Sequence, residues 1–184
     1  MEEIEVKVLG IDRKRVEEKL LALGAKKVFD GEVYGIFYDY SDGSVRKAKD
    51  TMRLRKVGDR AYLTYKKFVE NDRAKIRSEY ETEVSDYEEA RKILKSLGLA
   101  EWMSMRKRRT SYELLGTHFE LDKHVDQYSY VPEFLEIEAK DLDTLYKYVK
   151  ALGYEKAECR PWTIVELAQY YSKKQNGKKF GKTS

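Results

Sequence analysis

Charged and apolar residues alternate along several short segments of the chain, a pattern typical of strands that bury one face and expose the other. In residues 3–8, EIEVKV, the charged residues Glu3, Glu5 and Lys7 alternate with isoleucine and valine. The same period of two recurs in residues 135–140, LEIEAK. The alternation predicts strands that each carry a row of charged side chains on one face.

A strand followed by a helix occurs three times in the sequence. The three units begin near Glu3, Tyr80 and Leu135, and in each the helical spacing of apolar residues ends at a Leu-Gly pair. An acidic residue that can cap the helix comes before it, and a glycine that suits a left-handed C-terminal position follows it. The predicted N-caps are Asp12, Asp86 (or Ser85) and Asp141, and the glycines are Gly24, Gly98 and Gly153.

The segments between these units are rich in β-branched and aromatic residues, which predicts further antiparallel strands. Residues 51–68 form a predicted hairpin with its turn at 58–59, and residues 105–124 form another with its turn near 115–116. A last helix is predicted over Thr163–Ser172. About eight strands, with two or three outer helices, predict an α+β fold in which a closed eight-stranded antiparallel β-barrel forms a tunnel with helices packed outside.

The composition indicates a single globular domain. The chain has 184 residues, of which 38% are charged and 41% are hydrophobic. We expect one domain over residues 1–172 and a basic, mobile tail over residues 173–184, where lysine and glycine replace any periodic apolar pattern. Abundant Lys and Glu with few Asn and Gln resemble the composition of heat-adapted (thermophilic) proteins.

The same composition disfavours several functional classes. No run of about 18 apolar residues occurs, so we expect no membrane-spanning helix. The single cysteine, Cys159, excludes an intramolecular disulfide and a thiolate zinc site, and no secretory signal is recognisable, so a cytoplasmic location is expected. The net charge of +4 is a small basic excess, which argues against nucleic-acid binding. Monomer and homodimer are both left open.

The charged strand faces, taken together, predict a polar interior. The outer helices need the apolar strand faces to pack against, which leaves the charged faces to point into the barrel. Unpaired buried charge is costly, so such an interior has to hold ions and water. His118 is an exception, because we expect it on the outward face of its hairpin. The charged faces comprise Glu3, Glu5 and Lys7; Arg53 and Arg55; Thr64 and Lys66; Lys75, Arg77, Glu79, Glu81 and Glu83; Lys107 and Arg109; Glu120 and Asp122; and Glu136, Glu138 and Lys140.

A lining that mixes carboxylates with arginine and lysine suits a polyanion that carries a metal ion. Paired carboxylates bind hard divalent cations such as Mg²⁺ or Mn²⁺. Several arginines and lysines together bind phosphate oxygens. The sequence therefore favours a metal-bound polyphosphate or nucleoside triphosphate. It contains no GxxxxGK[ST] motif, which excludes phosphate binding by a P-loop.

An ordered series of motifs resembles the CYTH superfamily, also called the triphosphate tunnel metalloenzymes. Residues 3–7, EIEVK, match the ExExK signature of that family, which is weak alone but is followed by a specific series. The resemblance spans roughly residues 1–171 and implies a closed eight-stranded antiparallel tunnel. The matching positions are Glu3-x-Glu5-x-Lys7, Arg53-x-Arg55, Lys66, Arg77, Glu81-x-Glu83, Lys107-x-Arg109, Leu121-Asp122 and Phe134-Leu135-Glu136-Ile137-Glu138.

The resemblance also implies roles for individual residues. Seven carboxylates look like the metal-binding set for two Mg²⁺ or Mn²⁺ ions: Glu3, Glu5, Glu81, Glu83, Asp122, Glu136 and Glu138. Eight cations resemble the triphosphate-binding set: Lys7, Arg53, Arg55, Lys66, Lys75, Arg77, Lys107 and Arg109. Among them Lys7, Lys66 and Arg109 are assigned a catalytic role, the stabilisation of charge on the leaving phosphate.

The reaction implied by the resemblance is metal-assisted phosphoryl transfer on a small triphosphate such as ATP, tripolyphosphate or thiamine triphosphate. A class IV adenylate cyclase would convert ATP to cyclic AMP and pyrophosphate, whereas a triphosphate hydrolase would use water as nucleophile. A binding module without turnover is the third alternative. Gly35 and Phe37 stand where the family commonly has Asp and Tyr, and in thiamine triphosphatases that Tyr resembles part of a catalytic Lys–Tyr pair.

Overall fold

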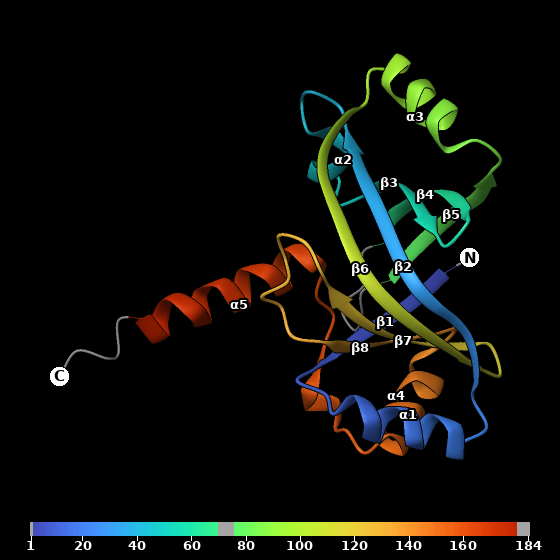
Figure 1. Ribbon diagram of the computed structural model, residues 1–184, viewed down its shortest axis with the longest axis vertical. Coiled ribbons are helices and arrows are strands. Elements are labelled where there is room, and N and C mark those ends of the chain that lie inside the picture. The colour runs from blue at the N-terminus through green and yellow to red at the C-terminus, as the bar shows by residue number, and fades with distance from the viewer. Residues whose placement is uncertain (1, 70–75, 180–184) are drawn as a thin grey trace.

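The computed structural model describes residues 2–69 and 76–179, and Figure 1 shows the arrangement of their helices and strands. This part of the chain contains five α-helices, nine strands and one short 3₁₀ helix. The helices are α1 (Arg13–Ala22), α2 (Ser44–Lys47), α3 (Tyr87–Ser96), α4 (Leu142–Ala151) and α5 (Ile164–Lys179), and the 3₁₀ helix spans Lys156–Glu158. The strands are β1 (Glu2–Leu9), β2 (Lys26–Asp39), β3 (Thr51–Val57), β4 (Arg60–Val69), β5 (Ile76–Val84), β6 (Ala100–Leu114), β7 (Thr117–His124), β8 (Phe134–Ala139) and β9 (Cys159–Arg160).

The fold is α+β, with one strongly curled antiparallel sheet that forms a half-barrel (Figure 1). Its strand order is β5-β4-β3-β2-β6-β7-β8-β1-β9, and β1 also pairs with β5 over Glu2–Ile4. The described residues thus hold one strand more than the eight predicted. The extra strand, β9, pairs with Lys7 and Val8 and is two residues long, too short to show an alternating pattern in the sequence. The closed eight-stranded barrel stays a prediction.

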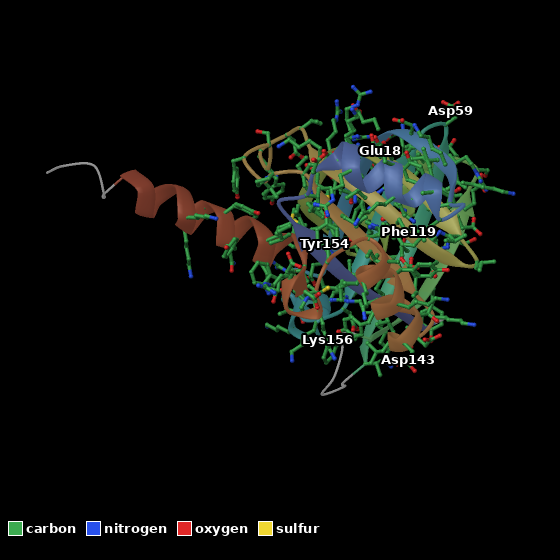
Figure 2. The ribbon with its side chains drawn as sticks, turned by 90° about the horizontal axis from the view of Figure 1, so that it is seen from below. Glu18, Asp59, Phe119, Asp143, Tyr154 and Lys156 are labelled. Carbon is green, nitrogen blue, oxygen red and sulfur yellow. The ribbon has the colours of Figure 1, made fainter. Side chains whose placement is uncertain are left out.

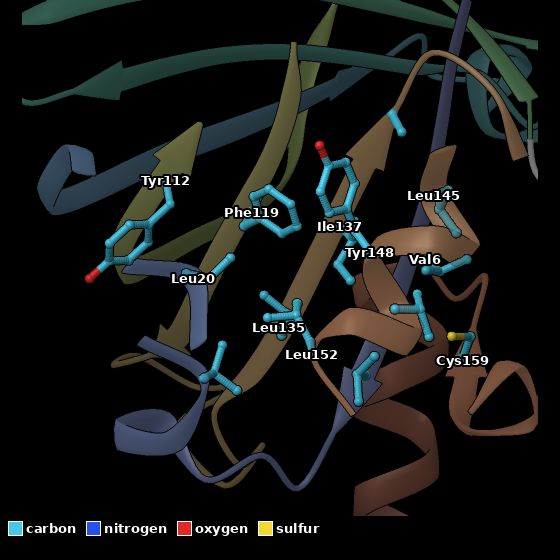
Figure 3. Close-up of a cluster of buried hydrophobic side chains, with 14 of the residues drawn as sticks. Val6, Leu20, Tyr112, Phe119, Leu135, Ile137, Leu145, Tyr148, Leu152 and Cys159 are labelled. Carbon is cyan, nitrogen blue, oxygen red and sulfur yellow. The ribbon is translucent and has the colours of Figure 1, made fainter. Parts of the chain in front are cut away.

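The outer face of the sheet carries the main hydrophobic core. Figure 3 shows Val6, Phe119 and Leu135 from the strands packed against Leu20 of α1 and Leu145 of α4. A second cluster joins α3 to the outer face of β2, β3 and β4. Truncation of a fully buried leucine such as Leu135 to alanine would cost about 2–5 kcal/mol. Because these clusters occupy the apolar strand faces, the charged faces are left on the inside of the curl.

All three predicted strand–helix units are confirmed as β1–α1, β5–α3 and β8–α4. In each unit the predicted aspartate accepts a hydrogen bond from a backbone amide in the first helical turn, at 2.7–3.2 Å. Such a cap stabilises a helix by about 0.5–2 kcal/mol. The glycines that follow the helices have φ between 84° and 87°, a left-handed conformation that suits glycine. The residues involved are Asp12, Asp86 and Asp141, then Gly24, Gly98 and Gly153.

Both predicted hairpin turns are confirmed as two-residue loops. Val57 pairs with Arg60 across the first turn, and Leu114 pairs with Thr117 across the second. In the second turn φ is positive at both positions, 50° at Leu115 and 76° at Gly116. This geometry matches the twist of the flanking strands and fixes which side chains face inward.

The C-terminal helix is longer than predicted. Helix α5 runs from Ile164 to Lys179 and so includes residues that the sequence had placed in a mobile tail, whose last part, residues 180–184, lies outside the described residues. The helix was predicted to begin at Thr163, which instead caps it. The backbone amide and the hydroxyl of Thr163 both donate hydrogen bonds to the side chain of Glu166. The first turns pack on β8, and the remainder projects from the body (Figures 1 and 2). None of the helices in the described ranges is long and apolar enough to cross a membrane.

Candidate functional site: a charged cavity inside the sheet

The inner face of the curled sheet encloses a cavity of about 360 Å³. Its walls combine seven arginines and lysines with six glutamates. The cations are Lys7, Arg53, Arg55, Lys66, Arg77, Lys107 and Arg109, and the acids are Glu5, Glu79, Glu81, Glu120, Glu136 and Glu138. The remaining lining residues are Phe37, Thr51, Met105, His118, His124, Phe134, Thr163 and Ile164.

Strand register decides which acid meets which base in this cavity. Lys7 lies opposite Glu136 across the β1–β8 pair, and Arg109 lies opposite Asp122 across the β6–β7 pair. Lys66 similarly lies opposite Glu79. Directly opposed side chains of unlike charge attract one another, so the sequence alternation and the antiparallel register together build ion pairs into the wall.

Asp122 holds two cations on one side of the cavity. Its carboxylate accepts hydrogen bonds from Arg109 Nε at 2.7 Å, from Arg109 Nη2 at 2.6 Å and from Lys107 Nζ at 2.5 Å. Arg109 also forms an ion pair with Glu120. Asp122 is fully buried, and although burial alone would raise the pKa of its carboxyl, the attraction of Arg109 and Lys107 lowers that pKa to about 2. The carboxylate therefore stays ionised and fixes both cations in place.

Lys7 is held by two carboxylates on the neighbouring wall. Its Nζ lies 2.6 Å from Glu136 and 3.3 Å from Glu5. Burial alone would lower the pKa of Lys7, but the attraction of Glu136 and Glu5 outweighs it and raises that pKa above its ordinary value. The same contact holds the pKa of Glu136 well below its usual range in spite of burial. Lys7 is thus a permanent cation at neutral pH rather than a proton acceptor.

Arg53 and Arg55, on β3, have fewer carboxylate partners than the cations of β1 and β6. Arg55 Nη2 lies 2.9 Å and 3.0 Å from the two carboxylate oxygens of Glu81, which also accepts a hydrogen bond from Thr64. Arg53 has no hydrogen bond or ion pair with any side chain that the structure describes, and its buried Nε is unsatisfied. Burial and the repulsion of Arg55 lower the pKa of Arg53 to about 10, so its guanidinium is still charged at pH 7. A half-buried cation that lacks such a partner is suited to an anionic ligand.

The structure brings most of the predicted site residues together. Seven of the eight predicted triphosphate-binding cations line the cavity, and Lys75 lies outside the described residues. Among the predicted metal-binding acids, Glu5, Glu81, Glu136 and Glu138 line the cavity, while Asp122 lies behind the wall. Glu83 lies apart from the cavity in contact with Arg60, and for Glu3 only the backbone in β1 is described.

Four further ionisable lining residues were not among the predicted site residues: Glu79, Glu120, His118 and His124. The prediction for His118 was wrong, because its neighbour Phe119 is fully buried in the outer core and His118 therefore faces the cavity. The signal was available in the period of two on β7, which puts His118, Glu120, Asp122 and His124 on one face. Burial raises the pKa of Glu120, and the nearby carboxylate of Glu136 adds to that effect against the attraction of Arg109.

His124 is a buried and neutral histidine at one end of the cavity. Only 2% of its surface is exposed, and its ring packs against Phe134 with centroids 6.1 Å apart. Burial, together with the repulsion of Lys107, lowers the pKa of His124 to about 4. Its Nδ1 has no hydrogen-bond partner within the described chain. The imidazole is therefore uncharged at pH 7 and can donate one hydrogen bond and accept another.

Gly35 and Phe37, which stand where the family commonly has Asp and Tyr, lie on β2 beside Arg53 and Arg55 of β3. Gly35 pairs with Arg55 and Phe37 pairs with Arg53, and a Cβ at position 35 would lie 3.6 Å from Arg53 Cδ. Phe37 lines the cavity, where it offers no hydroxyl. Asp39, at the end of β2, instead accepts hydrogen bonds from the amides of α2 and from Arg46, at 2.6–3.2 Å. Asp39 therefore orders the β2–α2 connection rather than lining the cavity.

The carboxylates of the cavity have the chemistry of a site for a hard divalent cation. Glu5 lies opposite Glu138 across the β1–β8 pair, and Glu136 lies two residues before Glu138 on the same inner face. Oxygen donors of this type fit Mg²⁺ or Mn²⁺. In the described parts of the chain, however, no three Asp, Glu, His or Cys side chains converge closely enough to form a metal site by themselves. Oxygen atoms of a ligand would have to complete the coordination.

The sequence and the fold of this chain are similar to those of several known proteins. The family model of the CYTH domain matches residues 1–153. A Methanocaldococcus jannaschii protein named as a candidate adenylate cyclase is 28% identical over 176 residues, which cover 91% of this chain and 98% of that protein. A solved structure from Pyrococcus horikoshii OT3 is 26% identical with a TM-score of 0.73, over 90% of this chain and 98% of that one. A Hippeastrum protein, described as a candidate adenylyl cyclase with a dominant triphosphatase activity, is 15% identical with a TM-score of 0.58, over 83% and 87% of the two chains.

Proposed function

The chain belongs to the CYTH domain family, and from that premise we propose that it is a divalent-metal-dependent enzyme that acts on a small triphosphate inside the charged cavity. The observation that carries the proposal is the set of seven buried or half-buried cations from five strands around one cavity, among which Arg53 has no hydrogen bond or ion pair with a described side chain. A linear triphosphate is an anion that can contact several of them at once. Each charged hydrogen bond to it contributes about 1.5–3 kcal/mol.

The proposal includes closure of the sheet into an eight-stranded tunnel. The pairing of β1 with β5 at Glu2, Glu3 and Ile4 supports it, because it joins the two ends of the order from β5 to β1. A closed wall would surround the triphosphate and keep bulk water from screening its contacts. The division into a domain over residues 1–172 and a tail over residues 173–184 remains part of the proposal, as do the cytoplasmic location and a monomeric or homodimeric state.

Metal binding is proposed at the carboxylate wall. Glu5, Glu136 and Glu138 would supply oxygen ligands, with Glu3 and Glu81 as further candidates, and the phosphate oxygens of the substrate would complete the coordination. When bound, Mg²⁺ or Mn²⁺ supplies charge neutralisation on the triphosphate and activation of the attacking oxygen. Two ions are proposed because the family resemblance implies two tasks, neutralisation of charge on the triphosphate and activation of the attacking oxygen.

The cations of this chain have separable tasks in the proposed reaction. Lys7, with its raised pKa, keeps a proton on Nζ and acts as a fixed positive charge rather than a base. Arg109 is held by Asp122 and Glu120, so its position is set before the substrate enters. Lys66 lies on β4 beside Glu79. Together Lys7, Lys66 and Arg109 would stabilise negative charge that develops on the leaving phosphate.

The first candidate reaction is conversion of ATP to cyclic AMP and pyrophosphate. The name of the Methanocaldococcus jannaschii relative supports it, since that likeness covers nearly the whole of both chains. The second candidate is hydrolysis of a triphosphate, which is supported by the activity described for the Hippeastrum protein of the same fold. Hydrolysis of thiamine triphosphate by a Lys–Tyr pair is the least supported version, because Phe37 provides no hydroxyl in the cavity.

Product analysis distinguishes these reactions. The protein is incubated with ATP, inorganic tripolyphosphate or thiamine triphosphate, each with Mg²⁺, with Mn²⁺ and with a chelator. Cyclic AMP with pyrophosphate identifies a cyclase, and orthophosphate identifies a hydrolase. Glu138→Gln should abolish turnover of the accepted substrate, whereas Glu101→Gln, which changes a carboxylate paired with Arg91 on the outside, should retain it. Metal-dependent binding without turnover would contradict the enzyme proposal and favour a binding module.

A further inference from the structure

The short connection between α2 and β3 holds Lys49 in a left-handed conformation, with φ of 61°. The amide of Lys49 donates to the Arg46 carbonyl at 2.9 Å, and the amide of Asp50 donates to the Val45 carbonyl at 3.0 Å, so α2 ends in a Schellman motif. Glycine is the usual residue at the left-handed position, because a side chain is crowded there. Lys49 instead places its ammonium group 4.8 Å from the centre of the Phe68 ring. This contact ties the connection to β4.

The carboxylate of Asp50 bridges two points on β4. Its Oδ2 accepts a hydrogen bond from the Tyr65 hydroxyl at 2.6 Å, and its Oδ1 accepts one from the Phe68 backbone amide at 2.7 Å. The hydrogen bond to Asp50, together with burial, raises the pKa of Tyr65 to about 12, so the phenol keeps the proton that it donates. The two contacts lie on either side of Lys66 along the strand.

The support that β3 gives to β4 ends at Lys66. Thr51, the first residue of β3, pairs with Lys66, so in the register of the described strands β3 has no residue opposite Phe68. The Asp50 carboxylate takes the place of the missing acceptor for the Phe68 amide. It therefore fixes the backbone of β4 at the position where the ladder between the two strands stops.

Asp50 makes these contacts from outside the cavity. Thr51 lines the cavity, and the alternation along β3 puts Asp50 on the opposite side. Tyr65 is likewise on the outer side of β4, since its neighbour Lys66 lines the cavity. The ammonium group of a lysine ends a flexible chain, so the direction of the backbone sets where that group can reach. A contact behind the wall thus sets the direction of a cation inside it.

We propose that Asp50 is a positioning residue, whose two contacts with β4 hold Lys66 in the orientation in which its Nζ binds a triphosphate. The inference rests on the proposed function, because Lys66 has this task only if a polyanion binds in the cavity. Without the carboxylate, the strand around Lys66 would have to be ordered when the ligand binds, and that ordering lowers affinity. Asp50 does not touch the ligand in this arrangement, so the loss of affinity should require Lys66.

The test is a double-mutant cycle on the affinity of the full-length protein for inorganic tripolyphosphate. Binding is titrated calorimetrically with Ca²⁺ as the metal, and each sample is checked for product. Asp50→Ala should weaken binding about five- to tenfold, and Lys66→Met alone about 10- to 100-fold. In a Lys66→Met background Asp50→Ala should cost less than about twofold, because the cation that it positions is absent. In a Lys107→Met background it should still cost about five- to tenfold.

Two milder variants keep the test decisive if Asp50→Ala impairs folding. Tyr65→Phe removes only the hydroxyl contact and should weaken binding about two- to fivefold, again only when Lys66 is present. Asp50→Asn retains an oxygen acceptor for the Phe68 amide and should recover most of the affinity. A side chain that acted only on overall stability would not show this dependence on one lysine.

Asp86→Ala is the matched control. Asp86 also accepts a hydrogen bond from a backbone amide, that of Glu89, but it is not among the described residues that line the cavity, so tripolyphosphate affinity should stay unchanged. Equal weakening by Asp50→Ala with and without Lys66 would overturn the inference and leave the proposed function intact, as would wild-type affinity in Asp50→Ala or in Lys66→Met. Absence of metal-dependent binding by the wild-type protein would overturn the proposed function together with the inference.

Discussion

Arg109, which is buried, and Arg53, which is half-buried, both lie on the inner face of the sheet, yet their surroundings are opposite. Arg109 donates two hydrogen bonds to Asp122 and forms an ion pair with Glu120. Arg53 has no such partner within the described residues, and its nearest charged neighbour along β3 is another arginine. Their pKa values reflect this difference, because carboxylates raise the pKa of Arg109 against burial, whereas burial and Arg55 lower that of Arg53.

The difference separates two regions of the cavity. The framework region lies around Arg109 and Asp122, and the binding region lies around Arg53 and Arg55. On the Arg109 side the charges already neutralise one another, so this wall keeps its shape without a ligand. On the Arg53 side the attraction of Glu79 and Glu81 does not offset burial and the repulsion of Arg55, so an added anion would stabilise this wall. A buried charge without a partner destabilises the empty protein. We interpret that cost as the consequence of keeping a site ready for a polyanion.

The largest expected effect is at the centre of the framework region. Asp122→Asn should lower the free energy of unfolding by about 3–5 kcal/mol, because Lys107 and Arg109 would lose the carboxylate that both contact. The measurement is urea denaturation of the apo protein. Glu101→Gln is the matched control, since it removes an outer ion pair worth about 0–1 kcal/mol. A loss of less than about 1 kcal/mol in Asp122→Asn would show that the framework does not depend on this carboxylate.

The next effect separates the two arginines directly. Arg53→Met should weaken binding of tripolyphosphate about 10- to 100-fold, as expected for one charged hydrogen bond, while the unfolding free energy stays within about 1 kcal/mol of wild type or rises. Arg109→Met should lower stability by about 3–5 kcal/mol, because it leaves Asp122 and Glu120 buried. Calorimetric titration and urea denaturation of both variants provide the comparison. Similar stability losses in the two variants would remove the distinction between the regions.

Acid should weaken the framework region within a defined pH range. The folded-state pKa of Asp122, about 2, lies below its value in the unfolded chain, so its stabilising contribution is present above about pH 4 and is lost as pH falls towards 2. The loss attributable to Asp122 is about 2 kcal/mol. Urea denaturation between pH 5 and pH 2 should show it in wild type, and Asp122→Asn should show a shallower decline. Parallel curves for the two proteins would contradict the assignment.

The smallest effect concerns two glutamates on β5 that share one strand face. Glu81 contacts Arg55 and Thr64 at the cavity, whereas Glu83 contacts Arg60 away from it. Glu81→Gln should lower the rate of triphosphate turnover about tenfold, in the range seen for residues that orient a metal site. Glu83→Gln should lower it less. The measurement is the steady-state rate with Mg²⁺ for the two variants, and a larger loss for Glu83→Gln would place the metal site nearer to that end of β5.

Much of the fold could be predicted because its signals are local. The caps at Asp12, Asp86 and Asp141 and the left-handed glycines follow from the chemistry of a few neighbouring residues. The turn at 115–116 likewise depends on two residues. The end of α5 could not be predicted in this way. Its helix continues past Ser172 through a lysine-rich stretch without a regular apolar pattern, so no periodic signal marks where it stops.

The candidate site was predicted less completely than the fold. Glu120 and His124 alternate with Phe119 and Leu121 as clearly as any predicted site residue does. His118 was nevertheless expected on the outside, although Phe119 beside it packs against α4. Glu120 shares that face and was expected to point inward, so the period of two, applied to His118 as well, would have placed it in the cavity.

The sequence by itself determined the strands, the rows of charge along them and the family resemblance, since a period of two and a motif series are properties of neighbouring positions. The tertiary structure decided the rest. The packing of α1, α3 and α4 on the apolar faces turned the charged rows inward. Strand register then gave Arg109 its carboxylate partners and gave Arg53 none among the described residues. Electrostatic energy in a cavity depends on distances between strands that lie far apart in sequence, and only the folded chain sets those distances.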